Sequence, residues 1–170
     1  MNRITSLCVA AAVSVVAGQA SAQTERPNFS GAWVQNMEKS WVPKGSTLQA
    51  YTDEIEHVGD SLKVVTILRR ADQETKSERA YVIGGEILIS GPGDAAIPIR
   101  LKWEGQTLVF EAKNPFMQDA DVRETWTLSA DGKVLTKVRR LPTPQGNQTQ
   151  TFVLEKRLRL PPAGAGPREP

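Results

Sequence analysis

The side chain best suited to acid–base chemistry in this sequence is His57, the single histidine. Histidine ordinarily titrates near neutral pH, so His57 is the default general acid or base, with Asp53 or Glu124 as its carboxylate partner. Haem binding through an axial histidine would depend on His57 as well. The residues after it, Val58-Gly59-Asp60, predict a turn, where a histidine is usually solvated. A hydrolase- or isomerase-type enzyme using His57 is therefore the third of three functional hypotheses.

Thiol and metal chemistry are weakly represented. The single cysteine, Cys8, lies in an apolar N-terminal run that we expect to be removed. The remaining chain would then have no disulfide, no thiolate nucleophile and no cysteine-ligated metal. One histidine with carboxylates alone would suit calcium at best. We therefore expect no metal site and no cofactor.

The tryptophans are the best candidates for contact with a ligand. Trp33, Trp103 and Trp126 could form an aromatic pocket, although tryptophans bury large areas in any β core. Trp41 belongs to an irregular segment with Met37 and Val42, which predicts either a lid over a cavity or a loop packed on its rim. The candidate ligand-binding residues are Trp41, His57, Trp103, Glu124 and Trp126.

Short β-type segments must position these residues. Turn-forming residues recur about every 8 to 15 residues, and the runs between them are rich in Val, Ile, Leu, Thr and Trp. A sheet of so many antiparallel strands tends to curl, and closure removes its exposed edges. We predict an all-β fold, a lipocalin-like antiparallel up-and-down β-barrel of about 8–10 strands. The predicted strands are residues 31–35, 51–58, 62–69, 78–83, 86–90, 97–103, 107–113, 122–128, 133–141 and 148–158.

Alternation along the strands predicts which face points inward. Leu101, Leu108, Phe110 and Leu154 fall on apolar faces and are expected in the core. Several polar residues share such a face, so they either line a wet cavity or reveal a wrong assignment of the face. They are His57 beside Ile55, Glu124 beside Trp126, and Arg140 beside Val138.

The segment Asn28-Phe29-Ser30-Gly31-Ala32-Trp33 resembles the Gly-x-Trp opening of lipocalins and related ligand-binding barrels. This resemblance implies that Gly31 allows close backbone approach and that Trp33 packs across the closed end of the barrel. It also implies a basic residue from a late strand, Arg157 or Arg159, stacked on the indole.

A closer resemblance is to a group of secreted lipocalin-like bacterial proteins. Four segments carry it: 28–33, Trp103-Glu104-Gly105, 124–133 and 152–156. These matches are dispersed over nearly the whole domain. They imply architecture rather than chemistry, because the group has no established activity.

The N-terminus predicts export. Arg3 precedes an apolar run from Ile4 to Ala17, and Ala20-Ser21-Ala22 fits the rule for signal-peptide cleavage. The run is shorter than the about 20 residues that span a bilayer. We expect a secretory signal peptide at 1–22, a barrel domain at 23–160 and a disordered Pro/Gly-rich tail at 161–170. The protein would then be periplasmic or secreted, without a membrane span.

Charge excludes one class of partner and leaves several functions open. Lys and Arg total 21 against 19 Asp and Glu, a formal net charge of +2, whereas a nucleic-acid binder would show a strong basic excess. The leading hypothesis is binding of a small apolar or amphipathic molecule in the barrel. The alternative is an interaction module that binds an envelope protein through the rim or the Trp41 loop.

Overall fold

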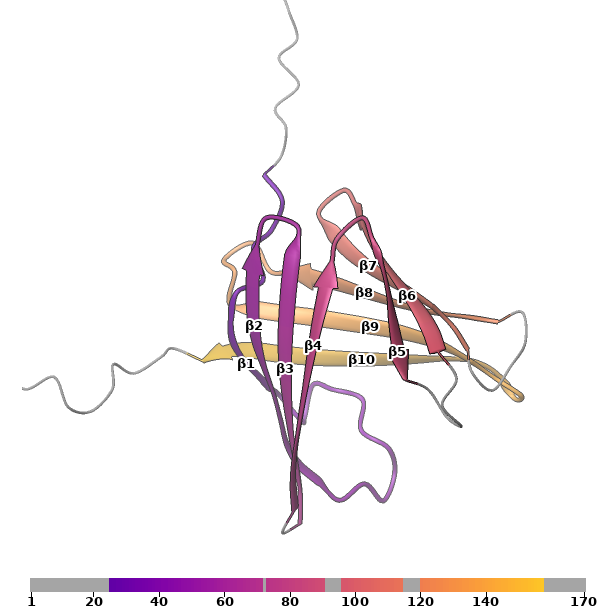
Figure 1. Ribbon diagram of the computed structural model, residues 1–170. Helices are drawn as coiled ribbons and strands as arrows, with labels where there is room; N and C mark the ends of the chain where they lie inside the picture. The colour runs from indigo at the N-terminus through magenta and orange to yellow at the C-terminus, as the bar shows by residue number, and fades with distance from the viewer. Residues whose placement is uncertain (1–24, 72, 91–95, 115–119, 158–170) are drawn as a thin grey trace, which may run out of the picture.

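The computed structural model describes residues 25–71, 73–90, 96–114 and 120–157 (Figure 1). The predicted signal peptide and tail lie outside these residues, as do Cys8, Leu158 and Arg159.

Within the described residues, ten antiparallel strands form one curled sheet in the order β4-β3-β2-β1-β10-β9-β8-β7-β6-β5. Because β1 pairs with both β2 and β10, the two ends of the domain meet, and β4 and β5 stand beside each other at the remaining gap (Figure 1). The result is the predicted all-β architecture, a nearly closed barrel. The strands are β1 (Gly31–Gln35), β2 (Leu48–Val58), β3 (Ser61–Arg70), β4 (Gln73–Val82), β5 (Glu86–Ser90), β6 (Ala96–Glu104), β7 (Thr107–Lys113), β8 (Asp121–Leu128), β9 (Val134–Thr143) and β10 (Gly146–Arg157).

Strand β4 begins earlier than the sequence predicts. Its first residues pair with the end of β3, from Arg70 opposite Gln73 to Ile67 opposite Lys76. Their side chains are exposed on both faces, so the segment has no apolar alternation to mark it as a strand. In Figure 1 this hairpin reaches beyond the end of β5.

The inner face of β9 differs from the predicted one. Leu135 and Lys137 are buried, whereas Arg140 is exposed. Of the two alternatives for Arg140, the structure supports the second, a wrong assignment of the face. The pattern misled because two basic residues, Lys137 and Arg139, occupy the inward positions and make the outer face of the strand look more apolar.

The Gly-x-Trp segment packs into the core at the end of the barrel that holds Phe29, Trp33 and Leu62, which we call the narrow end. Trp33 is fully buried, and its Nε1 donates to the backbone oxygen of Phe29 at 2.9 Å. The cation over the indole is Lys156, whose Nζ lies 5.2 Å from the ring centroid. Arg157 pairs with Ala32 and is exposed, so the expected stacking of Arg157 on Trp33 is corrected to Lys156.

Gly31 makes this contact feasible. Its φ is +144°, and a Cβ added there would lie 2.7 Å from Cε of Lys156. The absence of a side chain therefore lets the Lys156 stem cross the first strand to reach Trp33, in a backbone conformation that other residues rarely adopt.

Candidate ligand-binding site

A buried ion pair lies at the centre of the barrel interior. Lys137 from β9 donates from Nζ to Oδ2 of Asp53 on β2 at 2.5 Å, and the two side chains are 5% and 0% exposed. The same ammonium lies 3.6 Å from the ring centroid of Trp126. Tyr51 Oη and Thr66 Oγ1 donate to the two Asp53 oxygens at 2.8 and 2.6 Å. Asp53 is thus fully hydrogen-bonded, as a buried carboxylate must be.

A second ion pair lies beside the first. Arg139 Nε donates to Oε2 of Glu124 at 2.6 Å, and Trp126 Nε1 donates to the other Glu124 oxygen at 2.6 Å. The Arg139 guanidinium also lies 5.7 Å from the ring centroid of Phe152. The predicted residues Glu124 and Trp126 therefore belong to one network with Lys137 and Arg139, which the sequence analysis missed.

This network sets the proton affinities of the groups around it. Burial raises the pKa of Tyr51 well above its ordinary value, and the neighbouring Asp53 carboxylate raises it further. Burial likewise raises the pKa of Tyr81. Burial alone would lower the pKa of Arg139, but the Glu124 carboxylate outweighs it and raises that pKa. Both hydroxyls therefore stay protonated at neutral pH, and Arg139 stays charged.

Beyond the ion pairs, several inward-facing side chains are only partly buried. Tyr51, Ile87, Ile99 and Phe152 pack against the core and are only partly buried. Their positions in the strands place these side chains inward. Ile99 and Leu101 are alternate residues of β6 and so share a face, and Phe152 lies opposite the buried Lys137. Their exposed parts face the lumen, its mouth or the gap between β4 and β5, so this end of the barrel is accessible to solvent.

Trp41 lies at this accessible end. Its backbone N–H donates to the oxygen of Thr151 at 2.6 Å, and its ring meets Phe152 edge-on at a centroid distance of 6.3 Å. The connection between β1 and β2 is thus fixed against β10. This is the place where a lid would lie, and whether Trp41 acts as one stays a prediction.

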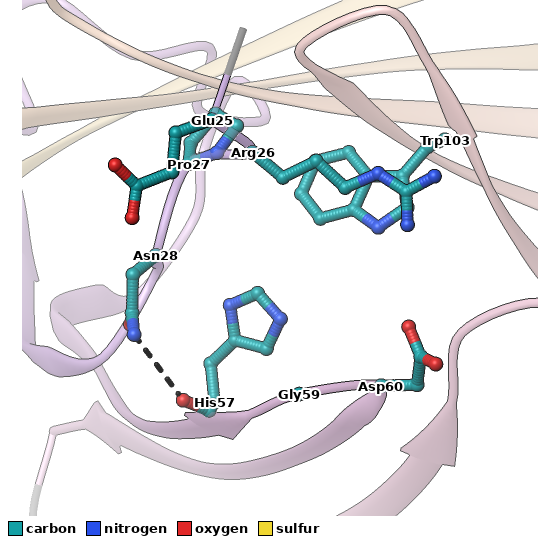
Figure 2. A pocket seen from close by; sticks show the side chains of 8 residues that line it. All are labelled: Glu25, Arg26, Pro27, Asn28, His57, Gly59, Asp60 and Trp103. Carbon is teal, nitrogen blue, oxygen red and sulfur yellow. Dashed lines mark hydrogen bonds between the residues drawn. The ribbon is translucent and has the colours of Figure 1, made fainter. Parts of the chain in front are cut away.

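His57 and Trp103 lie at the opposite, narrow end, on a separate pocket of about 620 Å³. Figure 2 shows the His57 ring, the Asp60 carboxylate and the Trp103 indole around the same space, with Arg26 beside the indole. The Arg26 guanidinium carbon lies 5.6 Å from the Trp103 ring centroid. The lining residues are Glu25, Arg26, Pro27, Asn28, His57, Gly59, Asp60 and Trp103.

His57 is a structural partner of the N-terminal segment rather than a solvated turn residue. It ends the inner face of β2, is 7% exposed, and accepts at Nδ1 a hydrogen bond from the Phe29 N–H at 3.2 Å. Burial lowers its pKa. No hydrogen bond among the described residues joins His57 to Asp53 or Glu124, so the expected acid–base pairing does not form. The five candidate residues thus divide between the lumen and this narrow-end pocket.

Phe29 packs between these two groups of residues, a contact that the sequence did not predict. It is fully buried, stacks on Trp103 at 5.9 Å and meets Trp126 edge-on at 5.8 Å. It separates the narrow-end pocket from the ion pairs of the lumen. The resemblance to a Gly-x-Trp opening was the one signal that drew attention to this segment.

Comparison with known proteins is informative at the level of fold. No family model matches the sequence, and no curated protein matches it significantly. Solved structures do match. Human cRBP IV is 15% identical, with 77% of this chain and 99% of that one covered and a TM-score of 0.56. This chain has a calycin-type barrel fold.

Two further matches have the same architecture. The zebrafish ileal bile acid-binding protein complexed with cholic acid is 17% identical, with 76% and 98% of the two chains covered and a TM-score of 0.56. The REP1-NXSQ fatty acid transporter is 15% identical, with 76% and 96% covered and a TM-score of 0.54. The described residues of this chain include no helix with the length and hydropathy that a membrane crossing requires.

Proposed function

We propose that this protein binds a small apolar or amphipathic molecule in the barrel lumen. The observation that carries the proposal is the partial exposure of inward-facing Tyr51, Ile87, Ile99 and Phe152 above a buried polar centre. Small-molecule sites usually combine a largely preformed apolar wall with a few fixed polar groups. The similar barrels named as a bile acid-binding protein and a fatty acid transporter support the same conclusion.

The geometry assigns different tasks to the two parts of the lumen. The apolar side chains of β5, β6 and β10 would receive a hydrocarbon group by removing it from water. The ion pairs Asp53–Lys137 and Glu124–Arg139 form a floor with fixed donors and acceptors. Since each charged group of the floor already holds a partner, we propose binding rather than catalysis.

A pair of neighbours on β5 gives a matched test. Ile87 faces the lumen and packs on the core, whereas Leu88 is 67% exposed on the outer face. Titration with the neutral dye Nile red should show saturable uptake that Ile87→Ala weakens and Leu88→Ala leaves unchanged. Native mass spectrometry of gently purified protein should show a retained small molecule.

Two results would count against lumen binding. One is a wild-type protein with no saturable uptake, and the other is an equal effect of the two β5 variants. Either would favour the alternative in which the barrel rim or the Trp41 loop binds an envelope protein.

Export completes the proposal. Arg3, the apolar run from Ile4 to Ala17 and the Ala20-Ser21-Ala22 site support a bacterial protein that acts in the periplasm or outside the cell. The intact mass of protein recovered after expression with its own N-terminus should correspond to a chain that begins at Gln23. Recovery of the full-length chain alone would contradict cleavage.

A further inference from the structure

One buried polar side chain of the barrel interior has no hydrogen-bond partner in the part of the chain that the structure describes. Gln35 ends β1 on the same face as Trp33, lies opposite Leu154 of β10 and is only 6% exposed. Among the described residues, neither its Nε2 nor its Oε1 has a hydrogen-bond partner. A buried amide without hydrogen bonds destabilises a fold. A state in which a bound molecule forms hydrogen bonds with Gln35 is therefore favoured over the state without that molecule.

The position of Gln35 connects it to the accessible end of the lumen. Val34 of β1 lies opposite Thr52 of β2. Because the two strands are antiparallel, the next residue of β1, Gln35, lies beside Tyr51 of β2. The Tyr51 hydroxyl already donates to Asp53, whereas its ring is partly exposed to the lumen. Gln35 thus lies on the strand face where a ligand that enters past Phe152 and Tyr51 would meet the polar floor. Both of its amide atoms are sealed from solvent, so the side chain would have to turn toward that ligand to bind it.

The polar floor has no spare positive charge. Lys137 is bonded to Asp53 and Arg139 to Glu124. Arg79 also faces inward, opposite Val64, but its side chain is exposed on β4 beside the gap in the barrel, where water screens it. An anionic head group placed on the floor would therefore add an uncompensated charge close to two carboxylates. Burial and these carboxylates raise the pKa values of Tyr51 and Tyr81, and the Arg79 guanidinium offsets part of this rise in the pKa of Tyr81.

We propose that the lumen selects an amphiphile whose head group is uncharged and both donates and accepts hydrogen bonds, a primary amide or a hydroxyl, and that Gln35 recognises it. This inference rests on the proposed function and specifies its ligand class. An amide or hydroxyl can satisfy both Gln35 atoms, whereas a carboxylate anion offers only acceptors.

Three ligands of equal chain length test the selection. Decanamide, decan-1-ol and decanoate should be titrated at pH 7.5 against protein loaded with Nile red. The amide and the alcohol should displace the dye at concentrations about tenfold lower than decanoate, because one to two hydrogen bonds are worth about that factor. Gln35→Leu should abolish this preference while it keeps the uptake of Nile red. Gln49→Leu, at an exposed position of β2, should leave the preference unchanged.

The outcomes separate the inference from the proposed function. Absence of saturable Nile red uptake in the wild type defeats both. If the protein takes up the dye but binds decanoate more tightly than decanamide and decan-1-ol, the head-group selection alone is overturned. This conclusion is most direct if Arg79→Gln then weakens the binding of decanoate. An unchanged preference in Gln35→Leu overturns the assignment of Gln35.

Discussion

Replacement of Lys137 by methionine tests the ion pair on which the site depends. Methionine keeps the length and packing of the lysine stem but removes its charge. The substitution loses a charge-assisted hydrogen bond of 2.5 Å to Asp53 and a cation–π contact of 3.6 Å to Trp126. When buried, such a hydrogen bond is worth about 1.5–3 kcal/mol and such a cation–π contact about 2 kcal/mol. Their sum agrees with the about 3–5 kcal/mol that loss of one partner of a buried pair usually costs.

Equilibrium urea denaturation followed by tryptophan fluorescence measures this effect. Lys137→Met should lower the free energy of unfolding by about 3–5 kcal/mol with an unchanged m-value. The double variant Asp53→Leu with Lys137→Met should recover most of that loss, since it removes the uncompensated carboxylate as well. A loss below about 1 kcal/mol for the single variant would refute the buried pair. A double variant no more stable than the single one would refute the coupling.

Four further measurements probe other parts of the barrel. Trp33→Ala should cost about 3–5 kcal/mol in urea denaturation because the indole is fully buried, and a loss below 1 kcal/mol would contradict its role at the narrow end. Gly31→Ala should cost about 1–3 kcal/mol, because its φ of +144° strains any other residue; an unchanged midpoint would argue against this conformation. Burial lowers the pKa of His57 in the folded state, so the unfolded chain binds the proton more readily. The Tm should therefore fall as the pH drops below about 6.5. This fall should be smaller in His57→Gln, and equal pH profiles of the two proteins would exclude His57 as its source. Gln35→Leu should raise the free energy of unfolding by about 1–2 kcal/mol because it removes an unpaired buried amide, and destabilisation would show that the amide has a partner.

The strand pattern of this chain was accessible from sequence because most inner faces are apolar. Leu101, Leu108, Phe110 and Leu154 lie on the predicted apolar faces and are all buried. Their strands could be placed before any coordinates, and the number of strands then favoured closure. The sequence was less informative at β4, whose side chains face water on both sides near Gln73.

The polar centre of the lumen could not be predicted in the same way. Lys137 and Arg139 alternate with Thr136 and Val138, and hydrophobic periodicity places basic residues outside by default. Only their partners, Asp53 on the distant β2 and Glu124 directly opposite Arg139 on the neighbouring β8, make the inward orientation favourable. The sequence does carry one signal, because Glu124 shares a face with the buried Trp126 and so needs a cation inside.

The interior therefore contains two kinds of polar group with opposite consequences. The ion pairs are satisfied within the chain, and they stabilise one arrangement of β2, β8 and β9 whether or not a ligand is present. Gln35 is unsatisfied among the described residues, and natural sequences usually tolerate such a group where function requires it. If Gln35→Leu both stabilises the empty barrel and removes its preference for an amide or hydroxyl, the stability lost at Gln35 is the cost of recognition. Stabilisation without a change in preference would instead mark Gln35 as a defect of the core that serves no ligand.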